Sequence, residues 1–272
     1  FSASGTLMKT WGYYGAGRGA FEHPAGVAVA SDGSVFVIQS GTKIIDFKNR
    51  FTFGRLQKFT PDGELIAEWG SAYTDLGPFH TPKGVAVDAQ GNIFVADSVN
   101  TSILKLTANG RLCAQWGQKG AGNGEFKEPA DVCVDHSGNV YAVDAQLSRV
   151  QKFTSTGAAE TAWGPCGSQP GRFLRPTSVA IDAEGSLFAA DLNNDRIQQF
   201  SPTGEFIGSW GGYGSAPDQL DKPYGLVFDS DGNLYVSDSG HGSVKHFTPN
   251  GELLGAIGSY GKGDGEFDHP QG

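Results

Sequence analysis

Histidine is the residue type in this chain best suited to hold a metal ion. His23 and His269 each stand directly before a proline, and His80 lies one place earlier in its equivalent stretch. Neutral imidazoles are frequent zinc ligands, so these three are the candidate metal residues. The three cysteines add no Cys-x-x-Cys or Cys/His ligand spacing. We therefore predict neither a metal centre nor another cofactor.

Carboxylates recur at a fixed spacing, and a ring of them could hold a cation. Asp144 and Asp191 each precede an arginine by five residues, Arg149 and Arg196. An Asp–Arg pair, or capping of the backbone within each copy of a repeat, explains this pattern without a ligand. The sequence also has no Gly-x-Ser-x-Gly segment and no phosphate-binding loop. Four copies carry this aspartate, and the first copy carries Gln39 instead; the full set is Asp97, Asp144, Asp191 and Asp238.

Tyrosines mark a candidate binding surface. Tyr14, Tyr213 and Tyr260 share one position between successive repeats, and Tyr224 lies close by. Exposed tyrosines suit recognition of proteins or sugars, because they combine a large apolar area with a hydroxyl group. Packing between linkers would also explain tyrosine at these positions. A binding role and a structural role therefore both stay open.

Basic residues gather in an 11-residue insertion that breaks the repeat. The insertion spans roughly 40–54 and carries Lys43, Lys48 and Arg50. Loops held on a rigid scaffold commonly carry function, although a tolerated surface insertion would look the same. Together with Lys83, these residues could form a local patch for RNA. The net charge of −9 argues against a general nucleic-acid binder, because phosphate neutralisation supplies most of the affinity of such proteins.

The elements that must position these residues come from an internal repeat. Each copy predicts four short strands: an apolar run, a glycine turn, a strand with an aromatic residue, a third strand, a second glycine turn, and a strand that runs into Trp-Gly. The 41 glycines and 13 prolines suit many tight turns, and the aromatic content of 11% can build a core. Copies are 47 residues apart, as the tryptophans show: Trp69, Trp116, Trp163 and Trp210.

Such a repeat predicts an all-β fold of the β-propeller type. A four-stranded antiparallel sheet cannot bury both faces alone, whereas sheets packed face to face in a ring can. We expect the first strands to lie innermost. An apolar residue three places before each proline should wedge between neighbouring blades; the set is Phe21, Phe79, Phe126, Phe173, Leu220 and Phe267. We predict one domain over 1–272, with repeats at about 24–70, 82–117, 129–164, 176–211 and 223–258.

The repeats resemble NHL repeats, and the copy from Pro176 to Gly211 is close to that pattern. The resemblance covers essentially the whole chain and implies the propeller fold more strongly than any function. Amidating lyases of this family place a histidine just after the proline, and some other members bind RNA. Here the positions after the proline carry no histidine, so the lyase site is not carried over; they are Ala25, Lys83, Ala130, Thr177, Tyr224 and Gln271.

The repeats are compatible with two numbers of blades. Five repeats are complete, while residues 1–12 and 270–272 read as parts of a sixth blade that is about two strands short. We favour a six-bladed parent, with this chain as a domain of a larger protein. In the alternative, five blades close the ring and residues 1–12 form a spare strand. An incomplete blade would expose sheet edges, which are prone to pairing with other chains.

The function we predict is a non-catalytic binding or scaffold module. Its linker face would present a site for a protein, peptide or glycan, and we expect no catalysis of its own. A propeller enzyme, a lyase or hydrolase with a metal in the central channel, is the alternative, and an RNA-binding NHL domain is the second. No apolar run is long enough to cross a membrane. The compartment is not set by the sequence, with an extracellular or periplasmic location slightly favoured.

Overall fold

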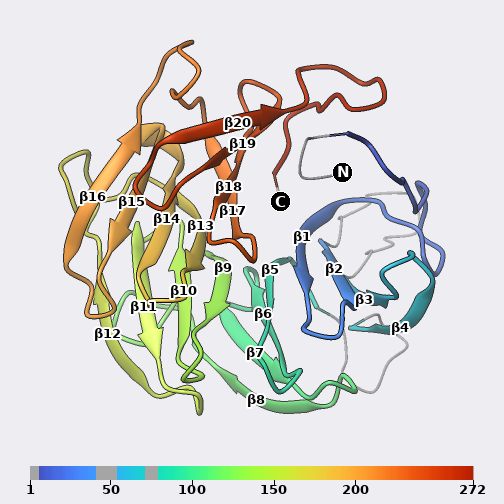
Figure 1. Cartoon of the computed structure of the whole chain (residues 1–272). Helices are drawn as coiled ribbons and strands as arrows, with labels where there is room; N and C mark the ends of the chain where they lie inside the picture. Colours follow the sequence, from blue (N-terminus) through green and yellow to red (C-terminus); the bar gives the residue numbers. More distant parts are fainter. Residues whose placement is uncertain (1–5, 41–53, 71–78, 272) are drawn as a thin grey trace, which may run out of the picture. The chain divides into compact units, whose positions relative to one another are not determined.

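The computed structural model describes residues 6–40, 54–70 and 79–271, which form five four-stranded sheets (Figure 1). The chain separates into two compact units, each described below by itself. Unit 1 comprises 1–10, 143–150 and 162–272, and unit 2 comprises 11–142 and 151–161. The only helical element among the described residues is a 3-10 turn at Leu192–Asn194. None of the helices in that part of the chain has the length and hydropathy needed to cross a membrane.

Each sheet follows the chain as a simple antiparallel meander, which we call a blade. Blade 1 is ordered β1-β2-β3-β4. Blades 2 to 5 are formed in the same order by β5–β8, β9–β12, β13–β16 and β17–β20. The strands are β1 (Pro24–Val29), β2 (Val35–Gln39), β3 (Arg55–Phe59), β4 (Leu65–Trp69), β5 (Pro82–Val87), β6 (Ile93–Asp97), β7 (Ser102–Leu106), β8 (Leu112–Trp116), β9 (Pro129–Val134), β10 (Val140–Asp144), β11 (Arg149–Phe153), β12 (Ala159–Trp163), β13 (Pro176–Ile181), β14 (Leu187–Asp191), β15 (Arg196–Phe200), β16 (Phe206–Gly211), β17 (Pro223–Phe228), β18 (Leu234–Asp238), β19 (Ser243–Phe247) and β20 (Leu253–Ile257).

The repeat prolines open the first strand of every blade. The register shifts directly after Pro24, Pro82, Pro176 and Pro223, so each proline sits at a bulge. A bulge at the start of a strand is where the missing N–H of proline costs the ladder least. First strands of neighbouring blades contact each other within each unit, as in the pairs β1 with β5 and β13 with β17.

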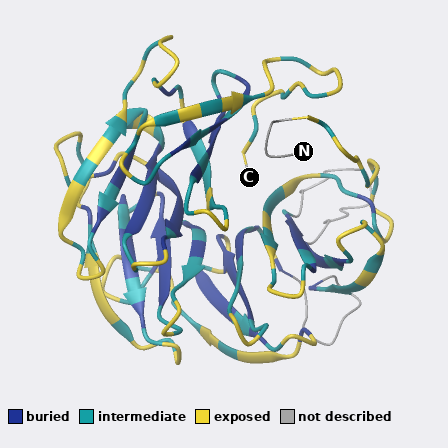
Figure 2. Cartoon of the chain, viewed as in Figure 1, coloured by how far each residue is buried: buried dark blue, intermediate teal, exposed yellow. Residues whose placement is uncertain are grey.

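Burial is greatest in the second and third strands and falls toward the fourth, as Figure 2 shows. In β6 all five residues are buried, whereas β20 alternates between half-buried and exposed residues. The fourth strand therefore forms the outer edge of each blade. An edge strand with one solvated face gives exactly this alternating pattern of burial in an antiparallel sheet.

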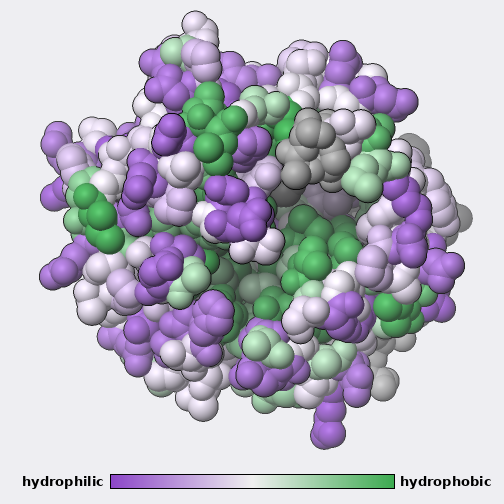
Figure 3. Space-filling model, in the orientation of Figure 1, coloured by the Kyte–Doolittle hydropathy of each residue, from purple (hydrophilic) through white to green (hydrophobic). Residues whose placement is uncertain are grey.

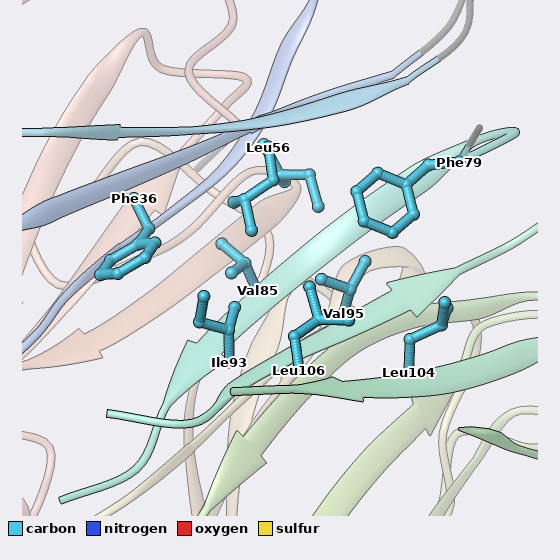
Figure 4. Close-up of a cluster of buried hydrophobic side chains, with 9 residues drawn as sticks. Phe36, Leu56, Phe79, Val85, Ile93, Val95, Leu104 and Leu106 are labelled. Atoms are coloured by element: carbon cyan, nitrogen blue, oxygen red, sulfur yellow. The ribbon is translucent and has the colours of Figure 1, made fainter. Parts of the chain in front are cut away.

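The core lies between successive blades. In unit 2, Phe36 and Leu56 of blade 1 meet Val85 and Val95 of blade 2, with Phe79 from the linker packed into the same cluster (Figure 4). Phe126 and Leu220 occupy the same place in two further clusters. The prediction that these linker residues wedge between blades is confirmed for Phe79, Phe126 and Leu220.

Glycine in the second turn of each repeat makes room for a tryptophan of the preceding blade. At Gly110 φ is +76°, and a Cβ there would overlap the indole of Trp69. Gly63 has φ +85° and stands in the same relation to Trp11. Only glycine satisfies both requirements, because it tolerates positive φ and leaves no side chain under the ring.

Candidate functional site

The linkers before blade 1 and after blades 2, 3 and 5 are closed loops, each with a β-bridge between two of its residues. In the linker after blade 5, Gly261 N–H donates to the Phe267 carbonyl (3.1 Å), and Phe267 N–H donates back to Ser259 (2.9 Å). Tyr260 therefore lies opposite the buried end of the loop. The same bridge joins Tyr14 to Phe21 in the first linker. The backbone, rather than the side chain, fixes the shape of these loops.

The three linker tyrosines are among the most exposed large side chains in the described residues. Tyr14, Tyr213 and Tyr260 are between 60 and 81% exposed. Tyr213 and Tyr260 belong to unit 1 and Tyr14 to unit 2. The neighbouring Tyr224 is half-buried, and its carbonyl accepts a hydrogen bond from the Thr177 hydroxyl (2.8 Å). Exposed phenol rings on fixed loops can supply contact area to a ligand at a small entropic cost.

Tyr260 is held by its own loop. Its ring meets the His269 imidazole edge to face, with centroids 5.5 Å apart. His269 Nδ1 donates to Asp268 Oδ1 (2.7 Å), and Lys262 lies 3.5 Å from the other carboxylate oxygen. The hydrogen bond from His269, with smaller contributions from Lys262 and Tyr260, lowers the pKa of Asp268. The loop thus presents a tyrosine whose neighbours already hold it in place.

Of the four basic residues predicted to join a binding patch, the structure describes Lys83. Lys83 Nζ donates to Glu128 (2.7 Å), and both side chains are partly covered. An ammonium group already paired with a carboxylate is a poor phosphate anchor, which weakens the case for RNA at this position. Lys43, Lys48 and Arg50 lie outside the described residues.

The repeated aspartates anchor the linkers to the blades. Asp97 accepts the backbone N–H groups of His80 (2.9 Å) and Thr81 (3.0 Å). Asp191 accepts Leu174 N–H (2.7 Å) and pairs with Arg196 Nε (2.9 Å). All four aspartates are completely buried. The predicted backbone capping is confirmed for Asp97 and Asp191, and the predicted pair with arginine is confirmed for Asp191.

Blade 5 uses a different set of partners, which sequence reasoning missed. Asp238 Oδ2 lies 2.7 Å from His241 Nδ1 and 2.8 Å from Lys245 Nζ. In blades 2 and 4 the residue at the position of His241 is an asparagine, Asn100 or Asn194, that donates to the aspartate. The position varies among the five copies, which carry Thr42, Asn100, Leu147, Asn194 and His241, so the sequence contains no clear signal for the histidine.

The candidate metal residues do not form a site in the described part of the chain. His23 and His80 are exposed in unit 2, and His269 is exposed in unit 1 on the tyrosine loop. Over residues 6–40, 54–70 and 79–271, no group of three or more His, Cys, Asp and Glu side chains is arranged to hold a metal ion.

Two family models match parts of the chain. A six-bladed β-propeller model matches residues 84–159, and an NHL-repeat model matches 220–247. The chain is an all-β propeller of four-stranded antiparallel blades, and the two matches support an NHL-repeat β-propeller family. The first model describes a six-bladed fold, which supports a six-bladed parent for the five blades described here. No curated protein matches the chain.

Solved structures share the propeller fold at low sequence identity. A protein of unknown function from Bacteroides caccae is 16% identical, covers 86% of this chain with 80% of its own, and gives a TM-score of 0.62. A chain of a nidogen/laminin complex is 18% identical over 86% of this propeller and 79% of that chain, with a TM-score of 0.63. Virginiamycin B lyase from Staphylococcus aureus is 13% identical over 85% and 83%, with a TM-score of 0.56. These likenesses concern the fold alone.

Proposed function

We propose that this propeller is a binding module that recognises a protein partner through the tyrosines of its linkers. The observation that carries the proposal is the exposure of Tyr14, Tyr213 and Tyr260 at one repeat position on loops whose shape the backbone fixes. Tyrosine is enriched among the residues that dominate protein interfaces, because one ring buries a large area and loses little side-chain freedom.

A protein partner is favoured over RNA by charge. The net charge is −9, and Lys83 is already paired with Glu128. A similar propeller occurs in a nidogen/laminin complex, where it is part of an assembly between proteins. A lyase of similar fold shows that the scaffold also supports catalysis. The described residues of this chain favour recognition, because three linkers expose a tyrosine ring at the same repeat position.

The test is a comparison of captured proteins between matched variants. The propeller is immobilised and incubated with extract of its source organism, alongside a variant in which Tyr14, Tyr213 and Tyr260 are all serine. The control replaces three exposed apolar residues of outer strands, Ile66, Ile207 and Leu254, by serine. A partner should be retained by the wild type and the control. Losing one hot-spot tyrosine costs about 2 kcal/mol, roughly a 30-fold loss of affinity, so the tyrosine variant should lose the partner.

Two results would count against the proposal. The first is that the tyrosine variant captures the same proteins as the wild type. The second is tyrosine-dependent binding to a glycan array with no protein retained, which would assign the surface to sugar recognition instead. Circular dichroism of all three proteins establishes that each variant is folded.

A further inference from the structure

Three linkers of unit 1 end in a basic residue with a left-handed backbone. Arg175, Lys222 and His269 each stand directly before a proline, and their φ angles are +59°, +54° and +55°. Residues other than glycine rarely adopt this region, because their Cβ crowds the backbone. Glycine would occupy the same position without strain. A long basic side chain at a strained position therefore points to a role beyond folding.

Hydrogen bonds hold the linker after blade 4 in this conformation. Asp195, between β14 and β15, accepts the N–H of Gly212 at its carbonyl oxygen (2.7 Å). Its Oδ1 accepts the N–H of Lys222 (2.9 Å). One aspartate thus ties both ends of the linker. Because Tyr213 follows Gly212 directly, the exposed tyrosine and Lys222 are held at the same end of the loop.

The linker after blade 5 repeats this arrangement. Tyr260 and His269 are the equivalent residues, and the edge-to-face contact of their rings places them side by side. Both residues are exposed. Figure 3 shows mainly hydrophilic surface over this loop, which follows β20 in Figure 1. The first linker carries the same pair at the same spacing of nine residues, Tyr14 and His23. A basic residue therefore accompanies each of the three exposed linker tyrosines.

Lys222 provides the strongest anchor for an anion among these basic residues. It is exposed and forms no ion pair with another described residue, whereas Lys83 pairs with Glu128 (2.7 Å). His269 is already paired with Asp268 (2.7 Å). An exposed ammonium group beside a phenol ring suits a carboxylate that arrives together with an apolar neighbour, because the charge and the ring each find a partner.

We propose that the linker after blade 4 binds an acidic segment of the protein partner. Lys222 pairs with a carboxylate of the segment, and Tyr213 packs on the residue beside that carboxylate. This inference rests on the proposed function and adds the chemical class of the segment that is recognised. Because the chain carries a net charge of −9, long-range attraction does not bring an acidic segment to the propeller. The preference for carboxylates must come from the direct contact with Lys222.

A phage-displayed library of random dodecapeptides tests this preference. It is selected against the whole chain and against the variants Lys222→Gln, Lys119→Gln and Tyr213→Ser. Lys119 is the matched control, an exposed lysine in a linker of unit 2. Aspartate and glutamate should be enriched about threefold among peptides retained by the wild type and by Lys119→Gln, as expected for an exposed ion pair. Peptides retained by Lys222→Gln should show no such enrichment.

The tyrosine variant separates this inference from the proposed function. Tyr213→Ser should retain fewer peptides, and those that remain should keep their acidic residues. Tyrosine-dependent peptides without enrichment of carboxylates would overturn the acidic segment and leave the binding module intact. Retention that Tyr213→Ser does not change would count against the proposed function instead. Binding of single-stranded RNA that requires Lys222 and falls steeply with salt, with no acidic peptide selected, would also overturn the inference.

A glycine variant tests whether the lysine serves the fold. Lys222→Gly removes the Cβ at positive φ and keeps the N–H that donates to Asp195. We expect its midpoint of urea unfolding to equal or exceed that of the wild type, because glycine adopts this conformation freely. Its preference for acidic peptides should be lost, as in Lys222→Gln. A lower midpoint in Lys222→Gly would show that the lysine stabilises the linker, and would overturn its assignment to recognition.

Discussion

Replacing Gln39 by aspartate should stabilise the protein. Gln39 and Arg55 are cross-strand partners on β2 and β3, and both are buried. Gln39 Oε1 and Arg55 Nε find no hydrogen-bond partner among the residues that the structure describes. The equivalent pair in blade 4, Asp191 and Arg196, makes this contact at 2.9 Å. Blade 1, the one described blade that lacks the repeat aspartate, therefore carries two buried polar atoms without a partner in the described residues, Gln39 Oε1 and Arg55 Nε.

The magnitude follows from those two atoms. Leaving a buried polar group unpaired costs about 1–3 kcal/mol, and a hydrogen bond to a charged group contributes about 1.5–3 kcal/mol. Burying a new carboxylate offsets much of this gain. Arg55 already pairs with Glu68 through Nη1 (3.3 Å), but its unpartnered Nε remains available to the new carboxylate. We expect a net increase of about 1–2 kcal/mol in the free energy of unfolding. That corresponds to a rise in Tm of roughly 3–6 °C for a chain of this size.

Thermal and urea unfolding of four proteins measures the effect: wild type, Gln39→Asp, Arg55→Lys and the double variant. Lysine keeps the positive charge but has no Nε donor, so the gain from Gln39→Asp should largely disappear in the double variant. If Gln39→Asp lowers stability, or raises it equally with Arg55→Lys present, the unpaired atoms are not the cause and the reasoning is refuted.

Three further predictions concern the core, the turns and pH. Phe79→Ala should lower the free energy of unfolding by about 3–5 kcal/mol, because the buried ring fills the cluster between blades 1 and 2; urea unfolding checks this, with the exposed Tyr213→Ala as control. Gly110→Ala should destabilise by more than 1 kcal/mol, because the methyl group meets the Trp69 indole and the backbone has positive φ; Gly212→Ala, also at positive φ but in open space, should cost less. Burial raises the pKa of Asp191, with its hydrogen bonds opposing the shift. The folded state therefore binds this proton more readily, so the contribution to stability is fully present below pH about 3.9 and is lost as pH rises through the raised pKa. Urea unfolding between pH 3.5 and 7 should show the stability of the wild type falling relative to that of Asp191→Asn as the pH rises.

The strand pattern of this chain was predictable because each blade repeats the same local chemistry. Proline, two glycine turns, a buried aspartate and a terminal tryptophan recur at fixed spacing, and each has a local physical role. The fold then follows from the need to cover both faces of every sheet. The residues that anchor the linkers, Asp97 and Asp191, were also interpreted correctly, since aspartate five places before an arginine or near free backbone N–H groups has few alternatives.

What the sequence did not reveal are contacts between residues of different repeats or between neighbours in a loop. Lys83 was assigned to a basic patch, but it pairs with Glu128, 45 residues later. Tyr260, predicted to bind a ligand, and His269, a metal candidate, contact each other through their rings, which the sequence did not predict. Spacing along the chain contains no information about such pairs, because they depend on how a closed loop folds back on itself.

The linker position of Tyr260 also shows where this scaffold can change its specificity at little cost. Backbone hydrogen bonds close the loop whether that position carries tyrosine, as at Tyr14, or a different residue, as at Lys119 and Cys166. Because the side chain takes no part in closing the loop, substitution there leaves the fold intact. The aspartate and proline positions have less freedom, since each satisfies a backbone requirement of the blade; among the five copies only blade 1 replaces the aspartate, by Gln39. Recognition should therefore be determined by the linker residues, and stability by the repeat that holds them.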